Sequence, residues 1–285
     1  MNQCLPRSAL DTKFVVGLRY QAICRTSYRR VALAGAGHHP GKYPPTWKQG
    51  LIMTSGEVAL ARGAWAPRAE ATWHGRRPPV RPLVAAMLAG DVSEACTLAD
   101  RFLARVGSRT AVVADLLQPA QYEVGELWYR GQIGIEAEHR AAAMLERVVI
   151  SLPNTPARSR VPPGTRCLLT VLPGEQHTLG LGMFALALED EGWDVELLDS
   201  DCEAYDLPNL AERARPRLVG ISAGYVPAAH GLAQVVKSIR DLGVPVLVGG
   251  AAFNRAGDLW RRVGASAYGA DARIGAVLAR RLVRQ

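Results

Sequence analysis

The chain has 285 residues, of which 48% are hydrophobic and 21% are charged, and its formal net charge is +8. This composition is ordinary for a globular protein with room for two domains. Five scattered cysteines without a C-x-x-C pair argue against a zinc or iron–sulfur site, and no apolar run reaches the roughly eighteen residues that span a bilayer. We therefore expect a cytoplasmic protein with reduced thiols.

The amino-terminal part carries the whole excess of positive charge. Residues 1–80 hold 12 Lys/Arg and 3 Asp/Glu, whereas the rest of the chain holds 22 and 23. Basic residues spread among Gly, Pro and Trp without a helical period are typical of disorder, so we predict a basic, disordered extension over residues 1–77. Met53 offers an internal start, which makes residues 1–52 a candidate over-extension. A flexible basic arm can bind nucleic acid, but a leader without function explains the charge equally well.

Four short helices are predicted between residues 78 and 152. Apolar residues recur at helical spacing. The first expected helix ends at Gly90 and the second at Gly107. The third runs from Ser108 to Trp128 with a kink or break at Pro119, and the fourth runs from about Ile135 to Leu152. Short helices joined by short loops predict a compact four-helix bundle.

A second domain is predicted over residues 165–285, after a Pro- and Ser-rich linker at 153–164. Five strand-like runs alternate with helical segments there, at Cys167–Leu172, Val195–Asp199, Arg217–Ser222, Val244–Gly249 and about Ala267–Gly269. The continuous apolar character of the third and fourth runs indicates buried parallel strands. We therefore predict a multidomain α + α/β protein, with the helical bundle followed by a flavodoxin-like, five-stranded, doubly wound parallel sheet.

A histidine loop follows the first predicted strand. His177 lies in Gly174-Glu175-Gln176-His177-Thr178-Leu179-Gly180, at the edge where open α/β sheets bind ligands. A neutral imidazole there is a good ligand for a soft metal centre. A lone loop histidine is more often simply solvated, but the next two strand ends also carry candidate residues, namely Ser222 and Gly224, and the pair Gly249 and Gly250.

This set resembles the cobalamin-binding fingerprint. The resemblance implies that His177 is the lower axial ligand of the cobalt, that Ser222 lies near the nitrogen of the nucleotide tail, and that Gly180 and the Gly249-Gly250 pair leave room for that tail. Glu175 stands where most members have Asp, and it can still accept from the imidazole N–H and orient the ring. Gly224 stands where many members have Leu or Thr.

Trp128, followed after nine residues by Glu138 and His139, resembles the signature of the helical cap in B12-dependent photoreceptor regulators. The resemblance implies that Trp128 packs on an upper 5′-deoxyadenosyl group and that Glu138 and His139 contact that group or its neighbours. An adenine face favours an aromatic wall, and ribose hydroxyls favour a carboxylate. Read alone, Trp128 is a core aromatic of the bundle. Many light-responsive members carry His where this chain has Tyr129, which argues against a second axial histidine.

The resemblance implies a regulatory protein that binds cobalamin, with adenosylcobalamin favoured over methylcobalamin, and that senses light or cofactor supply. Residues 1–77 show no compact helix-turn-helix pattern of the MerR type, so we expect action through a protein partner or a homo-oligomer rather than direct DNA binding. The alternatives are a corrinoid protein that carries methyl groups for a methyltransferase, a mutase subunit, and a binder of another tetrapyrrole.

Overall fold

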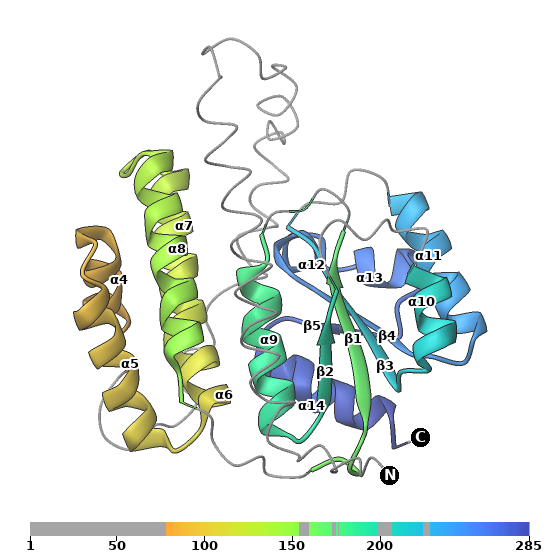
Figure 1. Cartoon of the computed structure of the whole chain (residues 1–285). Coiled ribbons are helices and arrows are strands. Elements are labelled where there is room, and N and C mark those ends of the chain that lie inside the picture. The colour runs from red at the N-terminus through yellow and green to blue at the C-terminus, as the bar shows by residue number, and fades with distance from the viewer. Residues whose placement is uncertain are drawn as a thin grey trace, which may run out of the picture.

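The computed structural model describes residues 78–153, 160–172, 175, 177–198, 207–224 and 229–284. The predictions for residues 1–77 lie outside this range. Figure 1 shows a bundle of helices beside a twisted sheet, with α9 (Leu179–Asp190) between them. Within the described residues, every helix is too short or too polar to span a bilayer.

The bundle contains the predicted helices with local capping at their ends. Its bounds are α4 Val80–Ala89, α5 Val92–Val106, α6 Arg109–Val112, a π-helical turn η1 Val113–Leu117, α7 Gln118–Tyr129 and α8 Ile135–Ser151. Gly90 and Gly107 end helices in the left-handed region, with φ of 79° and 63°. The Asp91 side chain accepts from the backbone N–H of Glu94 at 2.9 Å and so begins α5.

The third predicted helix is broken, as the sequence suggested, but the break is a π-helical turn. It comes immediately before Gln118, and Pro119 follows inside the first turn of α7. Proline is tolerated at that position because the first N–H groups of a helix have no intrahelical partner. Helices α6 and α7 are thus joined through the π-helical turn without an intervening loop.

The sheet is parallel throughout and has the strand order β2-β1-β3-β4-β5, which confirms the flavodoxin-like prediction. Its strands are β1 Arg166–Val171, β2 Asp194–Leu197, β3 Leu218–Ser222, β4 Val246–Gly249 and β5 Ala267–Gly269. The helices after them are α9, α10 Leu207–Ala214, α11 Ala229–Asp241, α12 Ala251–Arg255, α13 Leu259–Arg262 and α14 Ala272–Leu282.

Alternate residues of the strands enter two hydrophobic cores. In β1, Cys167 and Leu169 join a core shared with α9, α14 and the bundle, whereas Leu168 packs on the opposite side with residues of α10, α11 and α13. This period of two places each apolar side chain on one face or the other. The bundle and one face of the sheet thus share a continuous apolar core.

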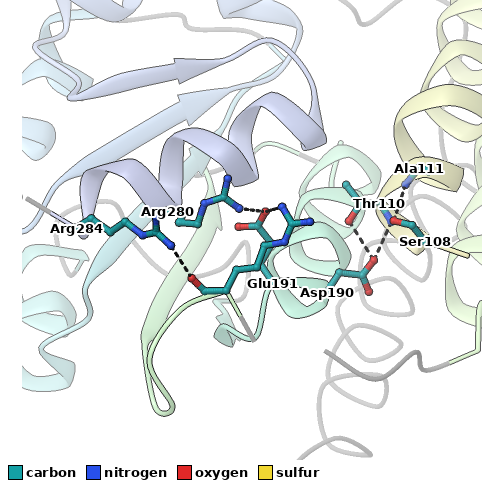
Figure 2. A network of polar contacts seen from close by, with 8 residues as sticks. Ser108, Thr110, Ala111, Asp190, Glu191, Arg280 and Arg284 are labelled. Carbon is teal, nitrogen blue, oxygen red and sulfur yellow. Dashed lines mark hydrogen bonds and ion pairs between the residues drawn. The ribbon is translucent and has the colours of Figure 1, made fainter. Parts of the chain in front are cut away.

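A polar network also joins the bundle to the end of α9 (Figure 2). Asp190 accepts from the Arg109 guanidinium at 2.8 Å, and its other oxygen accepts from the backbone N–H and the hydroxyl of Thr110. Next to it, Glu191 accepts from Arg280 of α14 at 2.7 Å. Because Arg109 and Asp190 are both more than nine-tenths buried, this ion pair fixes one end of the bundle on the sheet.

Candidate functional site

The histidine loop lies at the topological switch point of the sheet. From β1 the chain crosses to β2 on one side, and from β2 it crosses to β3 on the other side of β1. The carboxyl ends of β1 and β3 are therefore flanked by connections that leave in opposite directions, which opens a crevice there. Glu175 and His177 follow β1, and Gly224 follows β3.

Glu175 ties the two strand ends together. One carboxylate oxygen accepts from the backbone N–H of Gly224 at 2.7 Å, and the other accepts from the backbone N–H of His177 at 3.0 Å and pairs with Nδ1 of the His177 ring. Burial alone would raise the pKa of Glu175, but these hydrogen bonds outweigh it and lower the pKa from 4.5 to about 2. Glu175 is thus an ionised carboxylate that orients the imidazole.

His177 is presented outward by this contact. Its side chain is 84% exposed, and because Nδ1 faces Glu175, Nε2 is the ring nitrogen directed to an outside ligand. The hydrogen bond to Glu175 raises the pKa of His177, burial opposes that rise, and the charges of Glu175 and Glu138 add to it. The contribution of Glu138 comes from a residue of the cap, in α8.

The cap residues named by the sequence lie together at one tip of the bundle. Trp128 is in the last turn of α7, and Glu138 and His139 are in the first turns of α8, 3.6 Å apart through Oε2 and Nε2. Trp128 is 38% exposed, so it is not a core aromatic of the bundle. The Glu138 side chain is only 17% exposed, which fits a residue in the gap between cap and sheet.

The glycines of the predicted site differ in what they leave room for. A Cβ on Gly224 would lie 2.8 Å from Glu175 Oε2, so glycine is needed for the carboxylate to approach the backbone. A Cβ on Gly249 would lie 3.1 Å from the Gly269 carbonyl, and Gly250 has a φ of 95° and lies against the backbone of Ala223. A Cβ on Gly180, in contrast, would meet no atom within 4 Å. Only Gly180 among these four has unfilled space beside it.

Ser222 lies where the sequence placed it, at the end of β3, paired in register with Val171 of β1 and Gly249 of β4. The sequence interpretation missed one polar residue beside the histidine, Thr178. The Thr178 hydroxyl is buried and has no hydrogen-bond partner among the described residues. Its position directly after His177 was the signal that could have singled it out.

The residues present fit a cobalt corrinoid. Among the described residues no group of three or more His, Cys, Asp and Glu side chains could hold a metal ion. A single oriented imidazole nevertheless suffices for a corrin, because the macrocycle itself supplies the four equatorial nitrogens. The space beside Gly180 and the unpartnered, buried hydroxyl of Thr178 belong to the few residues that follow His177, and a tail with polar groups requires such room and partners.

Comparison with known proteins agrees with this geometry. A family model described as a B12 binding domain matches residues 165–276, and a second model with the same description matches residues 80–152. The HTH-type transcriptional repressor CarH of Myxococcus xanthus is 30% identical over 215 residues, which are 72% of this chain and 71% of that protein.

Two further proteins are similar over a smaller part or in fold alone. An uncharacterized 20.5 kDa protein from the bchF-crtJ intergenic region of Rhodobacter capsulatus is 28% identical over 151 residues, which are 51% of this chain and 78% of that protein. The monomethylamine corrinoid protein of Methanosarcina barkeri has the same fold, with a TM-score of 0.58 and 17% identity over 70% of this chain and 96% of its own.

Proposed function

Because this chain belongs to the B12-binding proteins that pair a helical cap with a Rossmann-like domain, we propose that it binds adenosylcobalamin and regulates a partner in response to light or cofactor supply. The partner is another regulatory protein or a second copy of the chain, in the cytoplasm. We keep the division into residues 1–77, 78–152, 153–164 and 165–285 as part of this proposal.

The observation that carries the proposal is the exposed imidazole of His177, oriented by Glu175 at the carboxyl edge of the sheet. Glu175 holds Nδ1 of His177, so Nε2 is the atom that would ligate cobalt from below. Glu138 of the cap acts electrostatically on the same ring. The exposed face of Trp128 and the polar groups of Glu138 and His139 are the side chains that would surround an upper ligand.

The upper side chains favour a large, partly polar ligand over a methyl group. A methyl needs only apolar contacts, whereas an indole face next to a carboxylate suits an adenine ring and ribose hydroxyls. Bound adenosylcobalamin supplies a cobalt–carbon bond that visible light breaks. Loss of the upper group would remove the contact for Trp128, and the cap would then shift and change the affinity for the partner.

The test is reconstitution in the dark with adenosylcobalamin, gel filtration, and then a spectrum and an elution profile before and after green light. If the cofactor is retained and light changes both the absorption spectrum and the elution profile, the result supports a photoreceptor. Retained cofactor without a light response overturns light sensing, and preferential retention of methylcobalamin supports the carrier alternative instead. His177→Ala should lose the histidine-ligated spectrum, and His139→Ala, which leaves the lower ligand in place, should keep it.

A further inference from the structure

The amino edge of the sheet, where the strands begin, lies opposite to the histidine loop and is rich in exposed arginines. Arg166 is the first residue of β1, and Arg217 directly precedes β3. Arg281 is in the last turn of α14 and Arg284 follows that helix, which ends near the beginning of β1 in Figure 1. We call the following exposed side chains the arginine edge: Arg160, Arg166, Arg215, Arg217, Arg281 and Arg284.

Hydrogen bonds to backbone carbonyls join the arginine edge into one surface. The Arg217 backbone N–H donates to the Arg166 carbonyl at 2.8 Å, and the Arg217 guanidinium donates to the carbonyl of Val283 at 3.0 Å. The Arg284 guanidinium donates to the Arg160 carbonyl at 3.4 Å. The beginnings of two neighbouring strands, the end of α14 and the segment before β1 therefore present their arginines together.

The arginine edge carries more positive charge than nearby carboxylates neutralise. Glu191 accepts from Arg280 at 2.7 Å, as Figure 2 shows, and lies 3.8 Å from Arg160. Asp194 lies 3.5 Å from Arg166. Within the part of the chain that the structure describes, no carboxylate lies at ion-pair distance from the other four arginines. Because a guanidinium has five N–H donors, each of these four retains donors for an outside acceptor.

Arg215 has a backbone conformation that suits glycine better than arginine. Its φ is 47°, in the left-handed region, where a residue with a side chain is uncommon. Its backbone N–H donates to the Ala211 carbonyl at 2.9 Å and ends α10, which glycine would do equally well. What arginine adds at this position is its exposed guanidinium, and the unfavourable conformation therefore indicates a role for the charge.

The composition of the edge favours phosphate groups over a folded protein. A guanidinium is planar, stays charged and donates two parallel hydrogen bonds to one phosphate or carboxylate. Protein interfaces add a core of aromatic and aliphatic side chains. Among the described residues, the exposed large hydrophobic side chains are Trp128, Tyr129 and Ile135 at the cap tip and Leu242 after α11. The arginine edge thus offers charge without an apolar core.

We propose that the arginine edge binds the phosphate backbone of a DNA duplex without reading its sequence. This goes beyond the proposed function, which concerns the opposite edge of the sheet. The expectation that residues 1–77 do not bind an operator rests on the missing helix-turn-helix pattern, and contacts to phosphates require no such motif. A partner that reads the sequence would gain affinity for DNA from this added contact.

The duplex and the cofactor have separate places on the sheet domain. Strand β1 has 6 residues, and at about 3.3 Å per residue its two ends lie about 20 Å apart. Solvent ions screen exposed charges over about 8–10 Å at ordinary salt concentrations. We therefore expect the affinity for the duplex to be the same with and without cobalamin.

The test is fluorescence anisotropy of two short, labelled DNA duplexes of unrelated sequence, titrated with the full chain over a series of salt concentrations. We expect equal affinity for both duplexes and weaker binding as salt rises. Each phosphate contact contributes about −0.9 to the slope of log K against log salt concentration. A variant that lacks one contact should therefore lose about 8-fold less affinity between about 0.1 M and about 1 M salt. The basic residues before residue 78 are the same in every variant, so differences between variants report on the edge.

Two substitutions each remove one guanidinium of the edge. Arg215→Gly and Arg281→Gln should each reduce the slope by about 0.9 and weaken the binding of both duplexes alike at low salt. Arg215→Gly also relieves the left-handed conformation, so the midpoint of thermal unfolding should stay the same or rise, and misfolding cannot explain its weaker binding. The matched control is Arg101→Gln, on an exposed arginine of α5 in the cap, which should change neither affinity nor slope.

The outcomes that would overturn the inference are distinct. Slopes of Arg215→Gly and Arg281→Gln equal to that of the unchanged chain would show that the edge does not bind DNA. Tighter binding of polyglutamate than of either duplex, lost in the same two variants, would assign the edge to an acidic protein instead. A marked preference for one duplex would contradict binding without sequence reading.

Failure of the proposed function is seen separately, because these titrations are performed without cobalamin. Retention of adenosylcobalamin after gel filtration is measured on the same variants and should be unchanged. A chain that retains no cobalamin but shows the expected slopes would contradict the proposed function and support the inference about the arginine edge.

Discussion

Replacing Glu175 by Gln tests the central electrostatic feature of the site. The fall in the pKa of Glu175 from 4.5 to about 2 means that folding stabilises the ionised form. At about 1.4 kcal/mol per pKa unit this corresponds to about 3 kcal/mol, and little is lost to solvent screening because the side chain is only 8% exposed. The folded pKa is the lower one, so this stability is present in full above the unfolded pKa and is lost as pH falls toward 2. Somewhat under half of this stability should remain at pH 3.

The assay is urea unfolding of the cofactor-free chain at neutral pH and near pH 3. Glu175→Gln should lower the free energy of unfolding by about 3 kcal/mol at neutral pH and by roughly half of that at pH 3. Glu212→Gln, on an exposed carboxylate of α10, is the control and should change little. Cobalamin affinity should fall about 10- to 100-fold with Glu175→Gln, as for other partners of a metal ligand. An equal loss of stability at both pH values would refute the role given to the charge.

Three further substitutions separate chain packing from cofactor binding. Gly224→Ala places a Cβ 2.8 Å from the Glu175 carboxylate, so it should cost about 1–3 kcal/mol in urea unfolding and also weaken cobalamin binding; unchanged stability would show that the carboxylate relocates freely. Gly180→Ala should leave the stability unchanged or raise it by up to about 1 kcal/mol, yet lower cobalamin affinity in a spectroscopic titration; full affinity would mean that no part of the cofactor lies there. Asp190→Asn removes the closer of the two carboxylates that pair with the buried Arg109, while Glu189 remains at 3.5 Å, and should cost about 1.5–3 kcal/mol in thermal unfolding; a cost under about 0.5 kcal/mol would contradict the role of this ion pair in holding the cap.

The parts of the fold that could be predicted are those set by residues close together in the sequence, such as the residues that end or begin a helix. Gly90, Asp91 and Gly107 act within a few residues of where they stand, so the ends of α4 and α5 follow from the sequence. The parallel, doubly wound sheet follows from the apolar runs and their alternation with helices. The π-helical turn did not follow from Pro119. Its residues contact α4 of the bundle and α14 of the sheet domain, which are distant in the sequence.

The candidate site was predictable where its residues share one loop or one strand end, and much less so elsewhere. His177 and Glu175 are two residues apart, and their contact is close to obligatory once the loop turns. Outside that loop, the Asn254 side-chain amide of α12 donates to the Tyr122 hydroxyl of α7, and because these residues are 132 positions apart, nothing in either neighbourhood marks them as partners. The Gly249-Gly250 pair was interpreted as room for a tail, but in the structure Gly250 is required by its own backbone conformation and its contact with Ala223.

The two sides of the proposed cofactor site differ in how firmly their side chains are held before the cofactor binds. Below, three hydrogen bonds to Glu175 fix the imidazole without any contribution from the cofactor, so little binding energy is lost in ordering it. Above, Trp128 and Tyr129 at the cap tip remain substantially exposed. A change in the upper ligand therefore acts on the less constrained side. The cap can respond while the lower ligand and the sheet stay in place, which is the asymmetry that a sensor with a retained cofactor requires.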